Sequence, residues 1–441
     1  MPEEPEPPGP DPDRSSQPAT PAAPPPFIGR SWPGGLAESG RKHLPEALRL
    51  PLFRRYLAGF GPLSLGTWMQ LVALGYLTLQ VTGSVAAVGL VGAADGIPAV
   101  VLSIPAGAVG DRFPRRLVLV VATSALGLTS LGLALAAGTS RASLPVLIGA
   151  AICFGAADAF NAPSRQALVA DLVPREQLLG AATLTSSVGS AARIVGPAIA
   201  GLLLGTLGAA SCFLAMAASV VPLLLVLSRG HWPAAKSSTT ELSALRRMLE
   251  GLSWCRGDPL IRSVLLGTLI LGLFGIGYMP YLPVFAKDQL HGGGQVLGLM
   301  YSVGGIGALA GGLALSLVSG RLRRDRLLLG AAPLYAMSLF GLTRAPTLWL
   351  AVPCLAGISL GFMAANTAML TTLQAAAPEM MRARVLALYS LAYAGGGPVG
   401  TLLYAGLSRV VPLFSAIAGG ALVVGMVLLW TATRPALRSL G

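Results

Sequence analysis

The sequence predicts an all-α polytopic membrane protein with twelve transmembrane helices in two six-helix bundles. Of its 441 residues, 54% are hydrophobic and only 11% are charged, whereas a soluble domain carries roughly 25% charged residues. The apolar residues gather in runs near the ~20 residues that a helix needs to cross a bilayer. Similar motifs recur in the two halves of the chain. A soluble enzyme is therefore excluded as a class.

The hydropathy pattern divides the chain into six segments. They are a Pro-rich tail (1–35), expected to be disordered and cytoplasmic; a basic amphipathic lead-in (36–56); an N-terminal six-helix bundle (57–228); a cytoplasmic linker (229–260); a C-terminal six-helix bundle (261–431); and a cytoplasmic tail (432–441). We expect the spans at 57–80, 86–108, 116–138, 144–163, 178–205, 209–228, 261–286, 296–318, 326–344, 347–370, 384–407 and 411–431.

The basic residues predict the orientation of these spans. With both termini in the cytoplasm, 26 Lys and Arg residues fall in inner segments and four in outer loops. Positive charge is retained on the cytoplasmic side of membranes. We therefore expect a multi-pass protein of the bacterial inner membrane with both ends in the cytoplasm. The clustering of basic residues between apolar runs also argues against nucleic acid as a partner.

The two halves of the chain repeat each other. Basic loop 110–116 is echoed by 320–326, and the Gly-Pro pair at 196–197 by the pair at 397–398. An even number of spans separates the copies, so the halves are parallel repeats. Such halves enclose a substrate cavity near mid-membrane in secondary transporters. No ATP-binding Walker loop and no metal-ligand spacing occurs, so we expect no enzyme, no metal and no cofactor.

The loop after the second span reads GAVGDRFPRRLVL at 107–119. It closely resembles the signature G-x-L-A-D-R-x-G-R-R-x-x-L of the major facilitator superfamily, with Pro114 in place of a glycine. The resemblance implies a cytoplasmic gate in which a carboxylate flanked by guanidinium groups joins helix ends. It assigns that role to Gly107, Asp111, Arg112, Arg115 and Arg116; an ordinary positive-inside loop is the alternative.

A second resemblance is narrower. The stretches around 161–168, 172–178 and 192–201 look like the branch of this superfamily that includes the bacterial enterobactin exporter. The spacing of Gly196, Pro197 and Gly201 also approaches an antiporter signature of drug exporters, with one extra residue. Small residues and proline equally allow close helix packing, and that role is at least as well supported.

Three charged residues lie within predicted spans and away from the span ends, at a depth where charge is costly and marks function: Asp95, Asp158 and Arg193. Asp95 lies near the midplane, and burial favours the neutral form of a carboxyl group. We expect Asp95 to carry the coupling proton and Arg193 to bias its titration or to hold an anionic part of the substrate. A fixed Asp–Arg pair that joins helices is the alternative. Asp158 lies two turns before Arg165 on the same predicted helix, and we expect both to brace the cytoplasmic gate.

Polar and aromatic residues within the spans are the candidates for a substrate cavity. They are Trp68, Gln70, Tyr278, Tyr281, Asn366, Tyr389 and Tyr393. Each could equally serve helix packing. A cavity with few charges suits a bulky amphipathic or apolar molecule.

Together these features predict a secondary transporter, expected as a monomer, that exports a drug, siderophore or secondary metabolite in exchange for protons. Its partners would be the bilayer, the substrate and the proton. An importer or facilitator of a small metabolite is the nearer alternative, and it calls for a more polar cavity. A receptor or assembly protein without transport is the other; it calls for a larger extramembrane module than the chain offers.

Overall fold

The structure is a computed structural model of the whole chain, and it describes residues 46–229, 252–318, 323–434 and 437. The predicted tail 1–35, most of the lead-in and most of the linker lie outside these ranges. Within them the secondary structure is helical. Ten helical segments are long and apolar enough to cross a membrane. The broken helix α3–α4 and helix α13 complete the twelve predicted spans.

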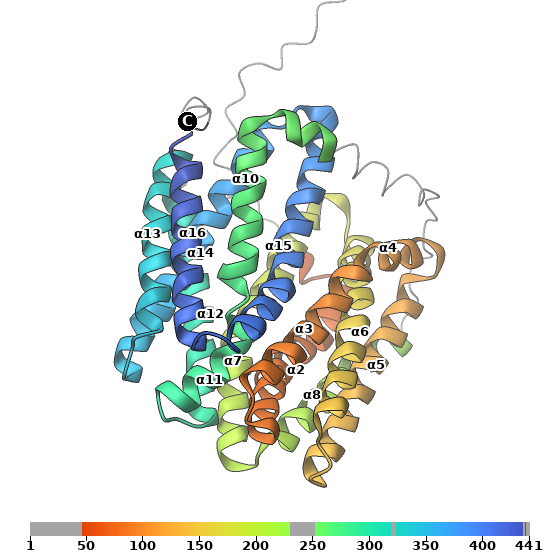
Figure 1. The fold of residues 1–441 in the computed structure, drawn as a ribbon. Helices are drawn as coiled ribbons and strands as arrows, with labels where there is room; N and C mark the ends of the chain where they lie inside the picture. The colour runs from red at the N-terminus through yellow and green to blue at the C-terminus, as the bar shows by residue number, and fades with distance from the viewer. Residues whose placement is uncertain (1–45, 230–251, 319–322, 435–436, 438–441) are drawn as a thin grey trace, which may run out of the picture.

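The N-terminal half contains α2 (Pro51–Thr82), α3 (Val85–Val101), α4 (Ser103–Arg112), α5 (Arg115–Gly138), α6 (Leu144–Leu172), α7 (Leu178–Thr206) and α8 (Ala209–Arg229). The C-terminal half contains α10 (Pro259–Ile270), α11 (Leu282–Val284), α12 (Gly294–Val318), α13 (Arg324–Leu342), α14 (Leu348–Ala376), α15 (Glu379–Leu407) and α16 (Leu413–Ala432). The two groups lie side by side in Figure 1.

The first two spans differ in detail from expectation. Helix α2 already begins at Pro51, inside the segment expected as a lead-in. The second span is interrupted at Leu102, three residues before Pro105, because a proline has no backbone donor and its ring crowds the carbonyl four residues earlier, here that of Val101. Residues 107–112 therefore form the end of α4, and the loop shrinks to Phe113 and Pro114.

The seventh span is not one regular α-helix. After α10 the chain forms a π-helical segment, η3 (Leu271–Ile276), a short 3₁₀ turn, η4 (Met279–Tyr281), α11 and a second π-helical segment, η5 (Phe285–Gln289). Side-chain hydroxyls satisfy carbonyls near these breaks: Tyr404 donates to Phe274 O at 3.0 Å and Tyr335 to Gly275 O at 2.8 Å. Irregular backbone survives within a membrane only where neighbouring helices supply such partners.

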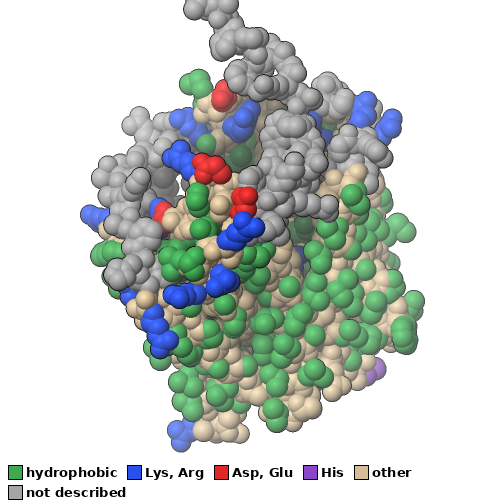
Figure 2. All heavy atoms as spheres, turned by 180° about the vertical axis from the view of Figure 1, so that it is seen from behind, with side chains coloured by type: hydrophobic (Ala, Val, Ile, Leu, Met, Phe, Trp, Pro, Cys, Tyr) green, Lys and Arg blue, Asp and Glu red, His purple; other side chains and the backbone are tan. Residues whose placement is uncertain are grey.

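The surface has the character expected of a membrane protein. Large apolar side chains are exposed on helices of both halves, with Trp349 88% and Met337 74% exposed. Figure 2 shows a broad hydrophobic face, with most of the charged side chains gathered at one end. A belt of this kind is stable only against lipid. We call the charged end the inner end, following the predicted orientation.

The two halves touch mainly toward the outer end. There a Cβ atom on Gly201 of α7 would lie 2.9 Å from Gly294 O and 3.0 Å from the Cα of Gly298 in α12. Helix α3 packs against α15, where a Cβ on Gly96 would lie 2.4 Å from Pro398 Cγ. Figure 1 shows the halves meeting near α11 and diverging toward α4 and the start of α10. The close contacts between the halves therefore lie away from the inner end.

Candidate functional site

A first cavity lies within the N-terminal half, between α2, α3 and α6. Its volume is about 160 Å³. The lining residues are Thr67, Trp68, Gln70, Leu71, Leu74, Asp95, Gly96, Ala99, Phe154, Gly155 and Asp158. We call this cavity the acidic chamber because it holds two of the three predicted membrane-embedded charges.

A second cavity, of about 150 Å³, lies between the two halves. Trp68 and Arg193 line it from the N-terminal half, and the C-terminal half supplies aromatic and aliphatic side chains, among them Tyr278, Tyr301 and Tyr393. We call it the aromatic chamber. Trp68 lines both chambers, so its indole stands at their boundary.

Backbone contact fixes the position of Asp95 against α6. A Cβ atom built on Gly155 would lie 1.9 Å from the carbonyl oxygen of Asp95. Only glycine allows two helices to approach this closely. Asp158 lies three residues after Gly155, on the next turn of the same helix face. Hence the two carboxyl groups share the acidic chamber, and Asp158 lies beside Asp95 as well as near Arg165.

Arg193 lies in the other chamber. Its guanidinium carbon is 5.9 Å from the ring centroid of Trp68, within the range of a cation–π interaction. Among the described residues, the ion pairs do not include one between Arg193 and Asp95. The structure therefore does not contain the fixed Asp–Arg pair that the sequence left open.

The predicted cavity residues of the C-terminal half fall into two groups. Tyr278 and Tyr393 line the aromatic chamber, and Tyr393 stacks on Tyr389 with ring centroids 6.3 Å apart. Tyr389 donates a hydrogen bond of 2.6 Å to Asn366, so this pair joins α15 to α14. Tyr281 is fully buried and donates to Thr401 O at 2.7 Å; it contributes to packing and lines neither chamber.

Gln70 occupies a distinctive position in the acidic chamber. The side chain is 1% exposed, and its Oε1 accepts a hydrogen bond from the hydroxyl of Ser130 on α5. Its Nε2 has no hydrogen-bond partner among the described residues. A buried amide nitrogen without a partner costs free energy, so the chamber contains a donor that is free to bind something within it.

The predicted gate residues form contacts inside the N-terminal half. Arg115 forms an ion pair with Asp171 of α6 and donates to Ala167 O at 3.1 Å. Arg116 donates to Ser228 O of α8 at 3.1 Å. The side chain of Asp111 and the surroundings of Gly107 lie outside the described part of the structure, and Arg112 is exposed at the end of α4. These contacts join three helix ends at the inner side.

Arg165 belongs to a second inner contact. It donates to Asn161 at 3.1 Å, and Asn161 donates to Thr123 of α5 at 2.9 Å. The guanidinium carbon also lies 4.7 Å from the ring centroid of Phe60 on α2. The residue therefore braces α6 against α2 and α5.

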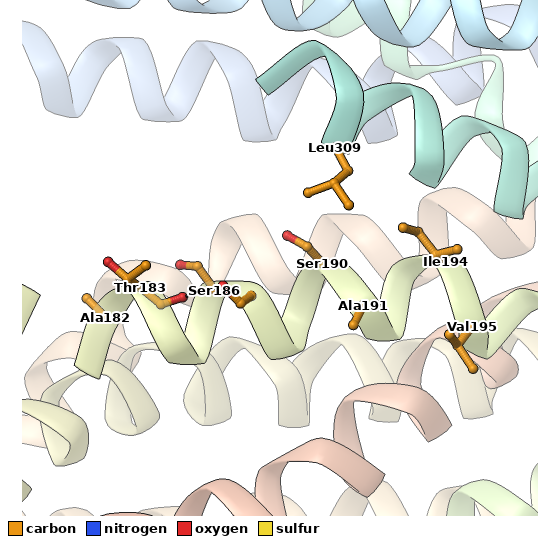
Figure 3. Close-up of a pocket in the computed structure, with 9 residues that line it drawn as sticks. Ala182, Thr183, Ser186, Ser190, Ala191, Ile194, Val195 and Leu309 are labelled. Atoms are coloured by element: carbon orange, nitrogen blue, oxygen red, sulfur yellow. Dashed lines mark hydrogen bonds between the residues drawn. The ribbon is translucent and has the colours of Figure 1, made fainter. Parts of the chain in front are cut away.

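The halves separate between the inner parts of α7 and α12. An open cavity of about 610 Å³ lies there, with Thr183, Ser186 and Ser190 directed into it from α7 and Leu309 facing them (Figure 3). It ends where the helices converge: a Cβ on Gly305 would lie 3.0 Å from Arg193 O, and Ser302 donates to Ile194 O at 2.8 Å.

Gly196, Pro197 and Gly201 all lie at close helix approaches of α7. A Cβ on Gly196 would lie 2.9 Å from Leu65 O in α2, and a Cβ on Gly298 in α12 would lie 2.5 Å from Pro197 O. These residues allow one helix to pack closely against both α2 and α12. The geometry is that of small residues at a membrane helix interface.

Sequence analysis missed several residues of these sites, among them Gly155 and Tyr301 of the chamber linings. Asp171 resembles an ordinary loop charge in the sequence, yet it is the partner of Arg115. Ser130 lies in an apolar run and orients Gln70. The sequence does contain a signal for Asp171: it is an acidic residue at the inner end of the fourth span, on the same side of the membrane as the basic loop between the second and third spans.

Twelve membrane helices in two parallel six-helix halves, with a chamber between them at mid-membrane, define a secondary transporter of the major facilitator fold. The comparisons identify the family. The model of the family described as transmembrane secretion effector matches residues 48–439, and the chain belongs to that family of the major facilitator superfamily.

Curated relatives and solved structures agree with this assignment. The chain is 29% identical over 398 residues to the enterobactin exporter EntS of Escherichia coli O1:K1 / APEC, and the match covers 87% of this chain and 93% of the relative. EntS of Shigella flexneri is 28% identical over 398 residues, and that match also covers 87% of this chain and 93% of the relative.

Solved structures share the fold. The nucleoside transporter NupG matches with a TM-score of 0.68 at 15% identity, covering 87% of this chain and 100% of that one. A bacterial homologue of the iron transporter ferroportin, in an inward-facing state, matches with a TM-score of 0.67 at 18% identity, covering 87% and 99%.

Proposed function

We propose that this transporter exports a hydrophobic or amphipathic small molecule from the cytoplasm in exchange for protons, by alternating access, with both termini in the cytoplasm. The relatives named as exporters support the direction. They also favour export over the alternative of metabolite import. The lining of the aromatic chamber supports the substrate class, because aromatic and aliphatic side chains surround a single guanidinium group.

The single observation that carries the proposal is the division of charge between the chambers. Asp95 and Asp158 lie in the acidic chamber and Arg193 in the aromatic chamber. A carboxyl group without an ion-pair partner at membrane depth can exist in the neutral form and take up a proton. A lone guanidinium beside aromatic rings can hold an anionic or electron-rich part of a substrate. One site thus binds the proton and the other the substrate.

The test uses an efflux-deficient bacterium that expresses the wild type, Asp95→Asn or Asp288→Asn. Asp288 is an exposed carboxylate outside both chambers, so its variant is the matched control. A panel of lipophilic drugs and siderophores is added, and cellular accumulation is measured. We expect the wild type and Asp288→Asn to lower accumulation of at least one compound and Asp95→Asn to fail, with equal amounts of protein in the membrane.

Two outcomes contradict the proposal. If Asp95→Asn still exports the compound in response to the proton gradient, Asp95 is not the carrier. If the wild type raises accumulation of a compound, the direction is import.

A further inference from the structure

We propose that Asp95 and Asp158 form a single proton-binding pair, in which the two carboxyl groups share one proton and the Gln70 amide donates a hydrogen bond to the negative charge that remains. This inference rests on the proposed proton coupling and names the second proton-binding group and the residue that positions the charge. It moves Asp158 from the gate, and Gln70 from the substrate cavity, to the proton site.

The first argument is geometric. Helices α3 and α6 touch through their backbones where Gly155 meets Asp95, so they cannot slide apart without breaking that contact. Asp158 follows on the next turn of α6, and both carboxyl groups line one chamber of about 160 Å³. The two groups are therefore held together by the fold itself.

The second argument concerns the neighbouring charges. Within the described ranges, neither Asp95 nor Asp158 has an ion-pair partner. Arg165, on the same helix, lies near enough to Asp158 to attract its carboxylate, but among the described residues it forms no ion pair with that group and is directed to Asn161 and Phe60. Arg193 lies in the aromatic chamber beside Trp68.

The other titratable groups on the elements packed against the chamber are more distant along those elements. The charged groups are Arg54 and Arg55 in the first turns of α2, Asp111 and Arg112 at the end of α4, Arg115 and Arg116 at the start of α5, Asp171 at the end of α6, and Glu379, Arg382 and Arg384 in the first turns of α15. The tyrosines are 56 and 76 on α2, 389, 393 and 404 on α15, and 278 and 281 beside η4. Two carboxylates close together in a medium of low dielectric repel each other strongly, so one of them retains a proton while the other ionises.

The third argument is the unpartnered amide. Ser130 holds the Oε1 end of Gln70, and the Nε2 end is buried without a partner among the described residues while the side chain lines the acidic chamber. An amide N–H can only donate. A pair that shares one proton always presents one negative oxygen as an acceptor, so Nε2 has a permanent partner in that state.

The test is an infrared pH titration of the purified full-length protein in lipid nanodiscs. It follows the absorption band of protonated carboxyl groups, and the double variant Asp95→Asn/Asp158→Asn supplies the background. For the wild type we expect two steps separated by more than about one pH unit, as for strongly coupled sites. In Asp158→Asn or Asp95→Asn one step should remain, lying about one pH unit or more below the upper wild-type step.

Gln70→Leu removes the donor, so the lower step should move to higher pH. Asp288→Asn should leave both steps unchanged. Asp158→Ser serves as a second replacement that also lacks the charge, and gel filtration shows that each variant remains folded.

A purely structural role for Asp158 predicts a different result: one step disappears and the other does not move. That outcome overturns the inference. Since the titration needs no substrate, it is independent of the accumulation assay. If the wild type shows the two-step titration but exports no compound, the proposed function alone is refuted. If the wild type exports normally but the remaining step does not move in Asp158→Asn, the pair alone is refuted.

Discussion

Replacing Gly155 by alanine perturbs the contact that holds the two carboxyl groups together. The added Cβ would lie 1.9 Å from the carbonyl oxygen of Asp95, 2.8 Å from its carbonyl carbon and 3.3 Å from its Cα. Ordinary contact begins at 3.4 Å, so α3 and α6 must separate locally by roughly 1.5 Å because protein interiors have no spare room. No flexible side-chain end can move aside, since all three atoms belong to the backbone.

The magnitude follows from two opposing effects. Overpacking a close contact costs about 1–3 kcal/mol, while replacing glycine within a helix recovers roughly 0.5–1 kcal/mol of backbone entropy. The difference is a net loss of up to about 2.5 kcal/mol in the free energy of unfolding, and we expect it near the upper end because the clash is with backbone atoms. The separation should also weaken the interaction between Asp95 and Asp158, and so narrow the gap between their titration steps.

The matched control is Gly149→Ala, on the same helix. A Cβ at Gly149 would meet no atom within 4 Å, so this variant keeps the entropic gain without the clash. The assay is the apparent thermal midpoint in detergent, measured for both variants beside the wild type. We expect the midpoint to fall for Gly155→Ala and to stay or rise for Gly149→Ala. If both variants raise the midpoint equally, the backbone contact between α3 and α6 is not as described here.

Two further predictions concern the chamber boundary and the inner gate. Trp68→Ala should lower export by about tenfold, because it removes a cation–π contact of roughly 1–2 kcal/mol and lets Arg193 reach the acidic chamber. Trp68→Phe should retain most of the export activity. Accumulation assays compare the two variants. Asp171→Asn and Arg115→Gln should show a coupling energy of about 0.2–1 kcal/mol in a double-mutant cycle of thermal midpoints, because both side chains are partly exposed. A coupling energy of zero would show that this ion pair does not stabilise the gate.

The sequence predicted the fold because lipid imposes a strong constraint on composition. A span must be apolar over its length, whichever neighbours it later finds, so the number of helices and the two halves could be read directly. Hydropathy does not register backbone geometry. The break at Leu102 depends on a nearby proline. The π-helical segments around 271–289 depend on partners from other helices, such as Tyr335 and Tyr404.

The candidate site could be predicted only as a set of residue types. The cost of charge at membrane depth singled out Asp95, Asp158 and Arg193, but the rotation of each helix decides which of them meet. Gly155 places Asp158 beside Asp95, and Trp68 stands between these and Arg193. No periodicity in the sequence contains this information, because it arises from contacts between helices far apart in the chain.

The two chambers differ in how they respond to movement of one half against the other. The acidic chamber is built by α2, α3 and α6 alone, so it travels as one unit with the N-terminal half. The aromatic chamber takes Trp68 and Arg193 from one half and the rest of its lining from the other.

Opening the outer end must break the backbone contacts between Gly201 and Gly298, and this requires whole helices to rotate. Such a rotation leaves the carboxyl pair intact and takes the aromatic chamber apart. In the proposed mechanism a proton would therefore stay bound throughout the movement, while the substrate would be parted either from Trp68 and Arg193 or from the lining that the C-terminal half supplies.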